Sequence, residues 1–199
     1  MNIEILTALC TFAFVASVTP GPNNLMLMAS GANFGIRRTL PHLCGIVAGF
    51  TVMVMLVGVG LMQIFAAYPV VYEVLRFFSI VYLGYLAWKI AASDSISASA
   101  STKPMTILQA ALFQWVNPKA WAFALTLVAV YAPTRSLAAV GFVALVASLV
   151  NLPSIFVWIV IGNRMQRYLR EGIRLRIFNY LMALLLLASL YPVVFGRLN

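Results

Sequence analysis

Long apolar segments dominate this chain of 199 residues, and they constrain its fold more than any other feature. A helix needs about 20 mainly apolar residues to cross the hydrocarbon core of a bilayer. Six segments have that character: residues 3–32, 43–66, 70–92, 107–131, 137–161 and 177–195. Only 9% of the residues are charged and 63% are hydrophobic, whereas a soluble domain has roughly 25% charged residues. We therefore expect an all-α membrane protein with six transmembrane helices.

A stretch rich in Ser and Ala, residues 93–105, divides these segments into two groups of three. Its composition is typical of a flexible connection. We predict a single transmembrane transporter domain over residues 1–199, with a first repeat at 1–92, a cytoplasmic linker, and a second repeat at 106–199. Because each repeat has an odd number of crossings, the two repeats would be inverted relative to each other in the membrane.

Basic residues predict which side of the membrane each loop faces, because cytoplasmic loops carry an excess of Lys and Arg. Arg76, Arg135 and Arg197 fall at one end of the predicted bundle. Nine basic residues fall at the opposite end: Arg37, Arg38, Lys89, Lys103, Arg164, Arg167, Arg170, Arg174 and Arg176. We expect that end to be cytoplasmic and both termini to be outside. The same rule explains the net charge of +9, so the expected surroundings are membrane lipid and not nucleic acid.

Two of the six segments are broken by prolines where a helix would otherwise continue. The first break comprises six residues: Thr19, Pro20, Gly21, Pro22, Asn23 and Asn24. The second comprises another six: Gln114, Trp115, Val116, Asn117, Pro118 and Lys119. Pro20 and Pro118 lie 98 positions apart, about half of the chain, so the breaks fall at matching places in spans one and four. Paired broken helices of this kind indicate the substrate site of a transporter.

Each break is expected to expose backbone groups of both polarities. Proline lacks an N–H and crowds the carbonyl four residues earlier, which would free the carbonyls of Ala16, Val18 and Gln114. Thr19 and Asn117 each precede a proline and are predicted N-caps of the half-helices that follow. A helix N-terminus attracts a carboxylate, and carbonyl or amide oxygens accept from an ammonium group. A zwitterionic amino acid would suit such a site.

Three further polar residues bear on the site. Lys119 is the most deeply placed ionisable residue, and intramembrane charges are usually functional; it would bind a substrate carboxylate or exchange a proton, unless its long stem carries the charge to an interface. Asn151 lies beside Pro153 and is a candidate for lining the same cavity. His42 opens the second segment, where we expect a satisfied interfacial histidine, with a gating role as the alternative.

The predicted substrate-binding residues are Thr19, Pro20, Gly21, Pro22, Asn23, Asn24, Gln114, Asn117, Pro118, Lys119 and Asn151. The sequence indicates no catalytic residue, no cofactor and no metal site. Gly31 and Gly35, like Gly45 and Gly49, have the spacing that lets helices approach closely. Such glycines are packing features first, and an exposed pair would also permit a homodimer.

An intramembrane enzyme is a competing reading. A hydrolase needs a nucleophile with a positioned base, but the only histidine, His42, is at the predicted interface and the only aspartate, Asp94, is in a loop. We therefore do not expect an enzyme. A passive channel or facilitator for small polar metabolites stays open as the alternative function, because broken helices also build pores. Saturable, pH-dependent flux would favour a carrier.

The Thr-Pro-Gly-Pro run at Thr19, the glycine-rich second segment and the Asn-Pro-Lys run at Asn117 resemble the lysine-exporter superfamily, and more narrowly its homoserine/threonine-resistance branch of amino-acid efflux proteins. The resemblance runs the whole length of the chain. The Leu-Ala-Trp-Lys run ending at Lys89 and the Lys-Pro pair at Lys103 look most like the cysteine/O-acetylserine exporters.

This resemblance implies efflux of an amino acid or derivative, neutral or sulfur-containing, from the bacterial cytoplasm across the inner membrane. It also implies proton antiport and alternating access, with protons as the coupling ion. Relatives often have an acidic residue in the fifth span, where this chain has Asn151. That departure leaves open which residue couples transport to protons.

Overall fold

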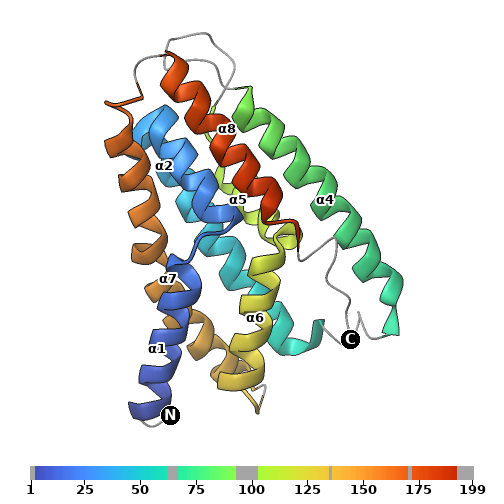
Figure 1. The fold of residues 1–199 in the computed structure, drawn as a ribbon. Helices are drawn as coiled ribbons and strands as arrows, with labels where there is room; N and C mark the ends of the chain where they lie inside the picture. Colours follow the sequence, from blue (N-terminus) through green and yellow to red (C-terminus); the bar gives the residue numbers. More distant parts are fainter. Residues whose placement is uncertain (1–2, 62–66, 93–102, 135, 170–171, 192–199) are drawn as a thin grey trace.

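The computed structural model describes residues 3–61, 67–92, 103–134, 136–169 and 172–191, and over these residues the fold is all-helical (Figure 1). The elements are α1 (Ile3–Val18), α2 (Pro22–Leu56), the π-helical turn η1 (Val57–Leu61), α4 (Pro69–Ala91), α5 (Ile107–Phe113), the 3-10 turn η2 (Gln114–Val116), α6 (Pro118–Tyr131), α7 (Leu137–Met165) and α8 (Gly172–Ala188). The prediction of an all-α protein is confirmed.

α2 consists of two arms that meet at Gly35. This glycine has φ 77° and ψ 174°, a conformation that side chains with a Cβ rarely adopt. The hydroxyl oxygens of Ser30 and Thr39 lie 2.9 Å apart, whereas nine residues of straight helix would separate them by about 13 Å. The chain therefore folds back on itself at Gly35, and the second arm starts before the predicted residue 43. The charged residues Arg37 and Arg38 lower the hydropathy of its first turns, so the prediction from hydropathy began the segment too late.

The helices run between two ends of the molecule. In Figure 1, α1 rises from the lower end and the first arm of α2 continues to the upper end. α5 and α6 together run the opposite way, while α4 and α7 rise and α8 descends. The break between α1 and α2 and the break between α5 and α6 both fall at middle height. Each interrupted column is therefore made of two short helices placed end to end.

Glycines allow α2 to pack closely on α7 and α5. A Cβ on Gly31 would lie 2.5 Å from the carbonyl oxygen of Ile159 on α7, and a Cβ on Gly49 would lie 2.5 Å from the Cα of Ala111 on α5. Both distances are far below ordinary van der Waals contact, so only glycine fits. Because Gly49 faces a helix of its own chain, its spacing with Gly45 serves internal packing and gives no support to a homodimer.

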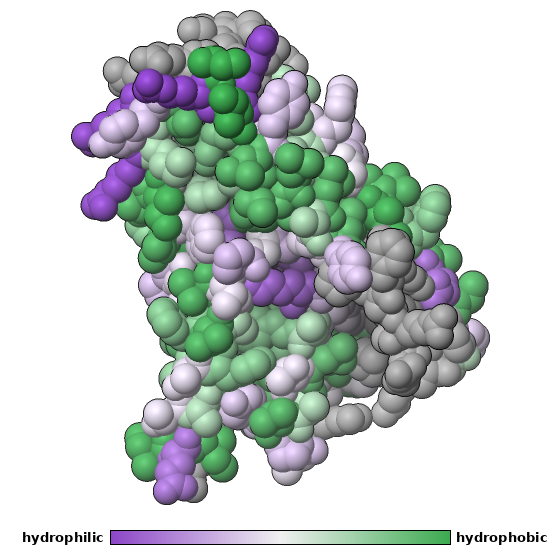
Figure 2. All heavy atoms as spheres, viewed as in Figure 1, coloured by the Kyte–Doolittle hydropathy of each residue, from purple (hydrophilic) through white to green (hydrophobic). Residues whose placement is uncertain are grey.

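The outer surface is apolar over much of its extent. Large hydrophobic side chains are exposed on several helices, among them Phe77 and Trp88 on α4 and Leu184 on α8. Figure 2 shows hydrophobic residues over most of one face, hydrophilic residues gathered at the upper end, and a hydrophilic notch at middle height. By length and composition, the stretches Pro22–Leu61 and Leu137–Met165 are apolar enough to cross a membrane, and the first of them comprises both arms of α2 together with η1. Exposed apolar surface on this scale requires lipid or a partner to cover it.

Candidate functional site

The two breaks lie against each other in the middle of the bundle. Asn23, in the first turn of α2, and Gln114, in η2, join their side-chain amides by two reciprocal hydrogen bonds. Asn23 Nδ2 donates to Gln114 Oε1 at 2.8 Å, and Gln114 Nε2 donates to Asn23 Oδ1 at 3.2 Å. Gln114 is completely buried. This paired amide fixes the two breaks at one height.

The carbonyls near the first break are bonded to side chains. Thr19 Oγ1 donates to the Ala16 carbonyl at 3.2 Å, and Trp158 Nε1 on α7 donates to the Val18 carbonyl at 3.2 Å. Asn24 Nδ2 donates to the Thr19 carbonyl at 2.7 Å. The expectation that Ala16 and Val18 would leave free carbonyls for a substrate is therefore wrong in this conformation. Nothing in the sequence indicated Trp158 as a donor, because it comes from a helix 140 positions away.

The N-caps agree with the prediction at one break only. Asn117 caps α6 as expected: its Oδ1 accepts from the backbone N–H of Lys119 at 3.1 Å, and Pro118 follows at the first helical position. At the first break the cap is Gly21 and not Thr19. The second proline of that motif, Pro22, starts the helix two residues later, so the N-terminus of α2 has no capping side chain.

Lys119 connects the second break to the first. Its ammonium nitrogen lies 2.6 Å from the carbonyl oxygen of Thr19, 2.8 Å from Thr19 Oγ1 and 3.4 Å from the carbonyl oxygen of Pro20. The stem of the lysine passes over Gly21, where a Cβ would lie 2.6 Å from Lys119 Cδ. The lysine therefore does not extend to an interface. It is held across the first break by oxygen atoms of that break.

A small cavity opens between the two breaks, the second arm of α2, and α7. Its lining residues are Ala16, Ser17, Gly21, Asn23, Asn24, Ile46, Phe50, Asn117, Lys119, Ala120, Phe123, Asn151 and Ile155. Six of the predicted site residues are in this set, and Lys119 is its one charged member. The other five are outside this lining: Thr19, Pro20, Pro22, Gln114 and Pro118. The sequence analysis did not predict the apolar lining residues or Ser17, because residues of these types occur in the same pattern in any buried helix.

Asn151 has an unsatisfied acceptor at this cavity. Its Nδ2 donates to Ser17 Oγ at 2.9 Å, but its Oδ1 is buried and has no hydrogen-bond partner. The residue is only 6% exposed. An unpaired buried acceptor costs about 1–3 kcal/mol, so a donor that reached this oxygen would relieve that cost.

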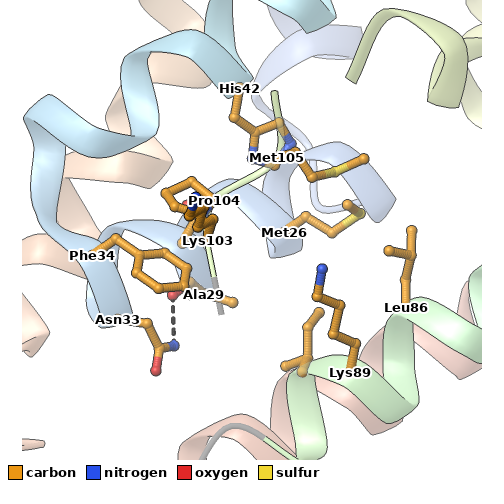
Figure 3. A pocket seen from close by; sticks show the side chains of 12 residues that line it. Met26, Ala29, Asn33, Phe34, His42, Leu86, Lys89, Lys103, Pro104 and Met105 are labelled. Carbon is orange, nitrogen blue, oxygen red and sulfur yellow. Dashed lines mark hydrogen bonds between the residues drawn. The ribbon is translucent and has the colours of Figure 1, made fainter. Parts of the chain in front are cut away.

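A second pocket was not predicted from the sequence. It lies between the two arms of α2, α4 and residues 103–105, and it includes Lys89, Lys103 and His42 (Figure 3). His42 is 1% exposed, and neither of its ring nitrogens has a hydrogen-bond partner. The expectation of a satisfied interfacial histidine is therefore wrong. The fold-back at Gly35 carries this residue against the first arm of α2, which the linear sequence does not reveal.

Comparison with known proteins gives a family and a set of relatives. Residues 14–189 match the family described as LysE type translocator. A protein of Escherichia coli strain K12 named cysteine/O-acetylserine efflux protein is 27% identical over 188 residues, which cover 94% of this chain and 95% of the relative. A protein of the same name from Shigella sonnei strain Ss046 matches with the same identity and coverage. No solved structure gave a significant match.

Proposed function

Because this chain belongs to the LysE type translocator family, we propose that it is a secondary transporter that exports an amino acid or an amino-acid derivative from the cytoplasm. The relatives named above are efflux proteins for cysteine and O-acetylserine. A neutral or sulfur-containing amino acid is accordingly the favoured substrate here. The inner membrane is the proposed location, and neither an enzymatic activity nor a cofactor is expected.

The observation that carries this proposal is the bond from Lys119 to the first break. Its ammonium group donates to the carbonyl oxygens of Thr19 and Pro20, which are the kind of acceptors that a substrate ammonium group requires. When an amino acid enters, its carboxylate would attract Lys119, and its ammonium group would take over the vacated carbonyls. A single exchange of partners would then satisfy both charges of a zwitterion.

The cavity offers further contacts to such a substrate. Asn151 Oδ1 is an acceptor without a partner, and the N-terminus of α2 has no side-chain cap and favours a carboxylate. Phe50, Phe123 and Ile46 supply apolar wall. Apolar walls discriminate weakly between side chains of similar size, so the charged ends of the amino acid would carry most of the recognition.

Alternating access between two inverted repeats is the proposed mechanism. Thr51 Oγ1 on α2 and Ser148 Oγ on α7 lie 2.6 Å apart and 97 positions apart in sequence, close to the spacing of 98 between Pro20 and Pro118. Residues related by an inverted repeat contact each other only near its pseudo-two-fold axis. This contact supports a single domain of two repeats, 1–92 and 106–199. Most of the predicted cytoplasmic linker at 93–105 lies outside the described residues.

The arrangement of the helix ends supports the proposed orientation. Arg37 and Arg38 follow the turn at Gly35, and Arg164 lies in the last turn of α7, so these residues share the upper end in Figure 1. By the positive-inside rule that end would be cytoplasmic. Both termini would then be outside, with six crossings in total.

Lys119 is the proposed proton carrier. It is the only charged side chain among the described residues that line the central cavity. In one state the lysine would be protonated and would donate to the Thr19 carbonyl, and in the other it would have released its proton. Alternation between these two states would couple outward movement of substrate to inward movement of a proton. Protons and a small amino acid would then be the two transported partners.

The proposal is tested by efflux of preloaded radiolabelled O-acetylserine and cysteine from proteoliposomes, with and without an imposed pH gradient. We expect gradient-dependent, saturable efflux from the wild type, and its loss in Asn117→Ala, which removes the cap of α6. Gradient-independent, unsaturable flux would instead support a passive facilitator. Absence of efflux of both compounds from folded protein would reject this substrate class.

A further inference from the structure

The second pocket lies on the opposite side of the first arm of α2 from most of α7. Its lining comes from the two arms of α2, from α4 and from the chain that leads into α5: Met26, Ala29, Ser30, Asn33, Phe34, His42, Leu86, Lys89, Ile90, Lys103, Pro104 and Met105. Figure 3 shows Lys89 reaching into this space from α4 and His42 directed towards Met105. The pocket is close to the end of the bundle where the basic residues gather.

Two lysines line this pocket from different elements. Lys89 is in the last turn of α4, and Lys103 precedes α5. Neither lysine has a hydrogen bond or an ion pair with any residue in the described part of the chain, and no acidic residue is among the lining. Two cations around one partly apolar cavity, with no counter-ion among the described residues, produce a local positive potential that favours an anionic group.

His42 is the second, independent indication of a ligand. Its ring is buried at 1% exposure and lines the pocket, yet both nitrogens lack a partner. Buried polar groups are almost always hydrogen-bonded, and leaving one unsatisfied costs about 1–3 kcal/mol. An imidazole can donate from one nitrogen to a carboxylate oxygen. Because the ring is 1% exposed, a ligand would reach it when neighbouring residues of the lining move aside.

We propose that this pocket is an entry site on the cytoplasmic side, in which a small amino acid binds through its carboxylate to Lys89, Lys103 and His42 before it reaches the central cavity. This inference rests on the proposed function. The two cavities lie along one helical arm: Met26 lines the pocket, while Asn23 and Asn24, less than one turn away, line the central cavity. A substrate leaving the entry site would therefore follow the first arm of α2 to Lys119.

The apolar part of the pocket fits the remainder of such a molecule. Met26, Leu86 and Ala29 are buried hydrophobic residues of the lining, and they would contact a short neutral or thiol-bearing side chain. The lysines are the only described charges in the lining. The site should therefore select for the carboxylate and against an additional cationic group on the side chain.

The single histidine makes a direct test possible, because the chain has no other. Full-length protein labelled with ¹⁵N-histidine would be studied by solid-state NMR in phosphatidylcholine bilayers during titration with O-acetylserine. We expect the imidazole signals to shift in the wild type and in Asn117→Ala, whose change lies in the other cavity. In the double variant Lys89→Met, Lys103→Met, the apparent affinity for O-acetylserine, read from the same signals, should fall at least tenfold. Arg37→Met, an exposed cation outside the lining, should behave like the wild type.

Three outcomes would overturn the entry site. One is the absence of a shift at saturating O-acetylserine in a protein that exports it, which would leave the proposed function intact. The second is a shift that the double variant retains. The third is a shift that appears only when anionic lipid replaces phosphatidylcholine, which would assign the pocket to a lipid headgroup. By contrast, the absence of efflux by the wild-type protein in proteoliposomes would reject the proposed function itself.

Discussion

The ammonium nitrogen of Lys119 lies 2.6 Å from the carbonyl oxygen of Thr19, a residue 100 positions earlier in the chain. Thr19 belongs to the break between α1 and α2, and Lys119 to the first turn of α6. A hydrogen bond from a charged ammonium group to a carbonyl oxygen is stronger than one between two neutral groups. This charge-assisted bond therefore connects the two breaks directly.

Replacing Lys119 with Met should abolish transport with a smaller effect on folding. The variant keeps the length of the side chain but removes the donor to Thr19 and Pro20. We expect efflux to fall at least tenfold, whereas the detergent-solubilised protein should still elute as one folded species. Lys119→Arg should recover part of the activity, because the charge is kept while the geometry of donation changes. Wild-type efflux by Lys119→Met would remove Lys119 from the site.

Gly21→Ala should act through the same lysine. The backbone of Gly21 is extended, with φ −179°, so alanine is not excluded by conformation. Its Cβ, however, would lie 2.6 Å from Lys119 Cδ, which forces the stem away from the first break. We expect reduced efflux, measured in proteoliposomes at equal protein content. Gly84→Ala on α4, where a Cβ would meet nothing within 4 Å, is the matched control, and equal losses in both variants would contradict this account.

The sequence predicted the breaks better than it predicted what fills them. Proline chemistry located the interruptions near Pro20 and Pro118 and the cap at Asn117, because these effects act within four residues. It could not reveal that Trp158 and Lys119 would satisfy the carbonyls of the first break, since those donors come from α7 and α6. His42 shows the same limit: a fold-back at a single glycine, Gly35, buried a residue that local hydropathy placed at an interface.

The amide pair of Asn23 and Gln114 should show strong energetic coupling. Asn23→Ala leaves the buried Oε1 of Gln114 without its donor, although Gln114 Nε2 keeps its bond to the Ala110 carbonyl. Gln114→Ala removes both partners of the Asn23 amide. We expect each single variant to lose about 1–3 kcal/mol of stability, and the double variant to lose clearly less than the sum. Thermal unfolding in detergent measures the cycle. The exchanged pair Asn23→Gln, Gln114→Asn should be more stable than either single alanine variant, and additive losses would refute the coupling.

Asn151→Ala should weaken substrate binding more than it weakens the fold. The wild-type side chain carries an unsatisfied buried Oδ1, so its removal relieves one unfavourable group while it also removes the donor to Ser17. We expect a higher KM for efflux with a small change in Tm. Ser154→Ala is the control, because Ser154 is buried on the same helix, bonds to its own Val150 carbonyl and is outside the cavity lining. A similar KM for both variants would argue against substrate contact at Asn151.

Gly162→Ala should destabilise the bundle, because this glycine sets the distance between α7 and the first arm of α2. A Cβ at Gly162 would collide with the carbonyl oxygen of Met28, and backbone atoms cannot rotate away as a flexible side chain can. Overpacking of this kind costs about 1–3 kcal/mol, which a lower Tm in detergent would report. Gly141→Ala on the same helix meets nothing within 4 Å, and its higher helix propensity should leave the Tm unchanged or raise it. Trp158 and Asn151 of α7 bond to Val18 and Ser17 at the end of α1, next to the first break. A displaced α7 in Gly162→Ala should therefore reduce efflux even at temperatures where the protein stays folded.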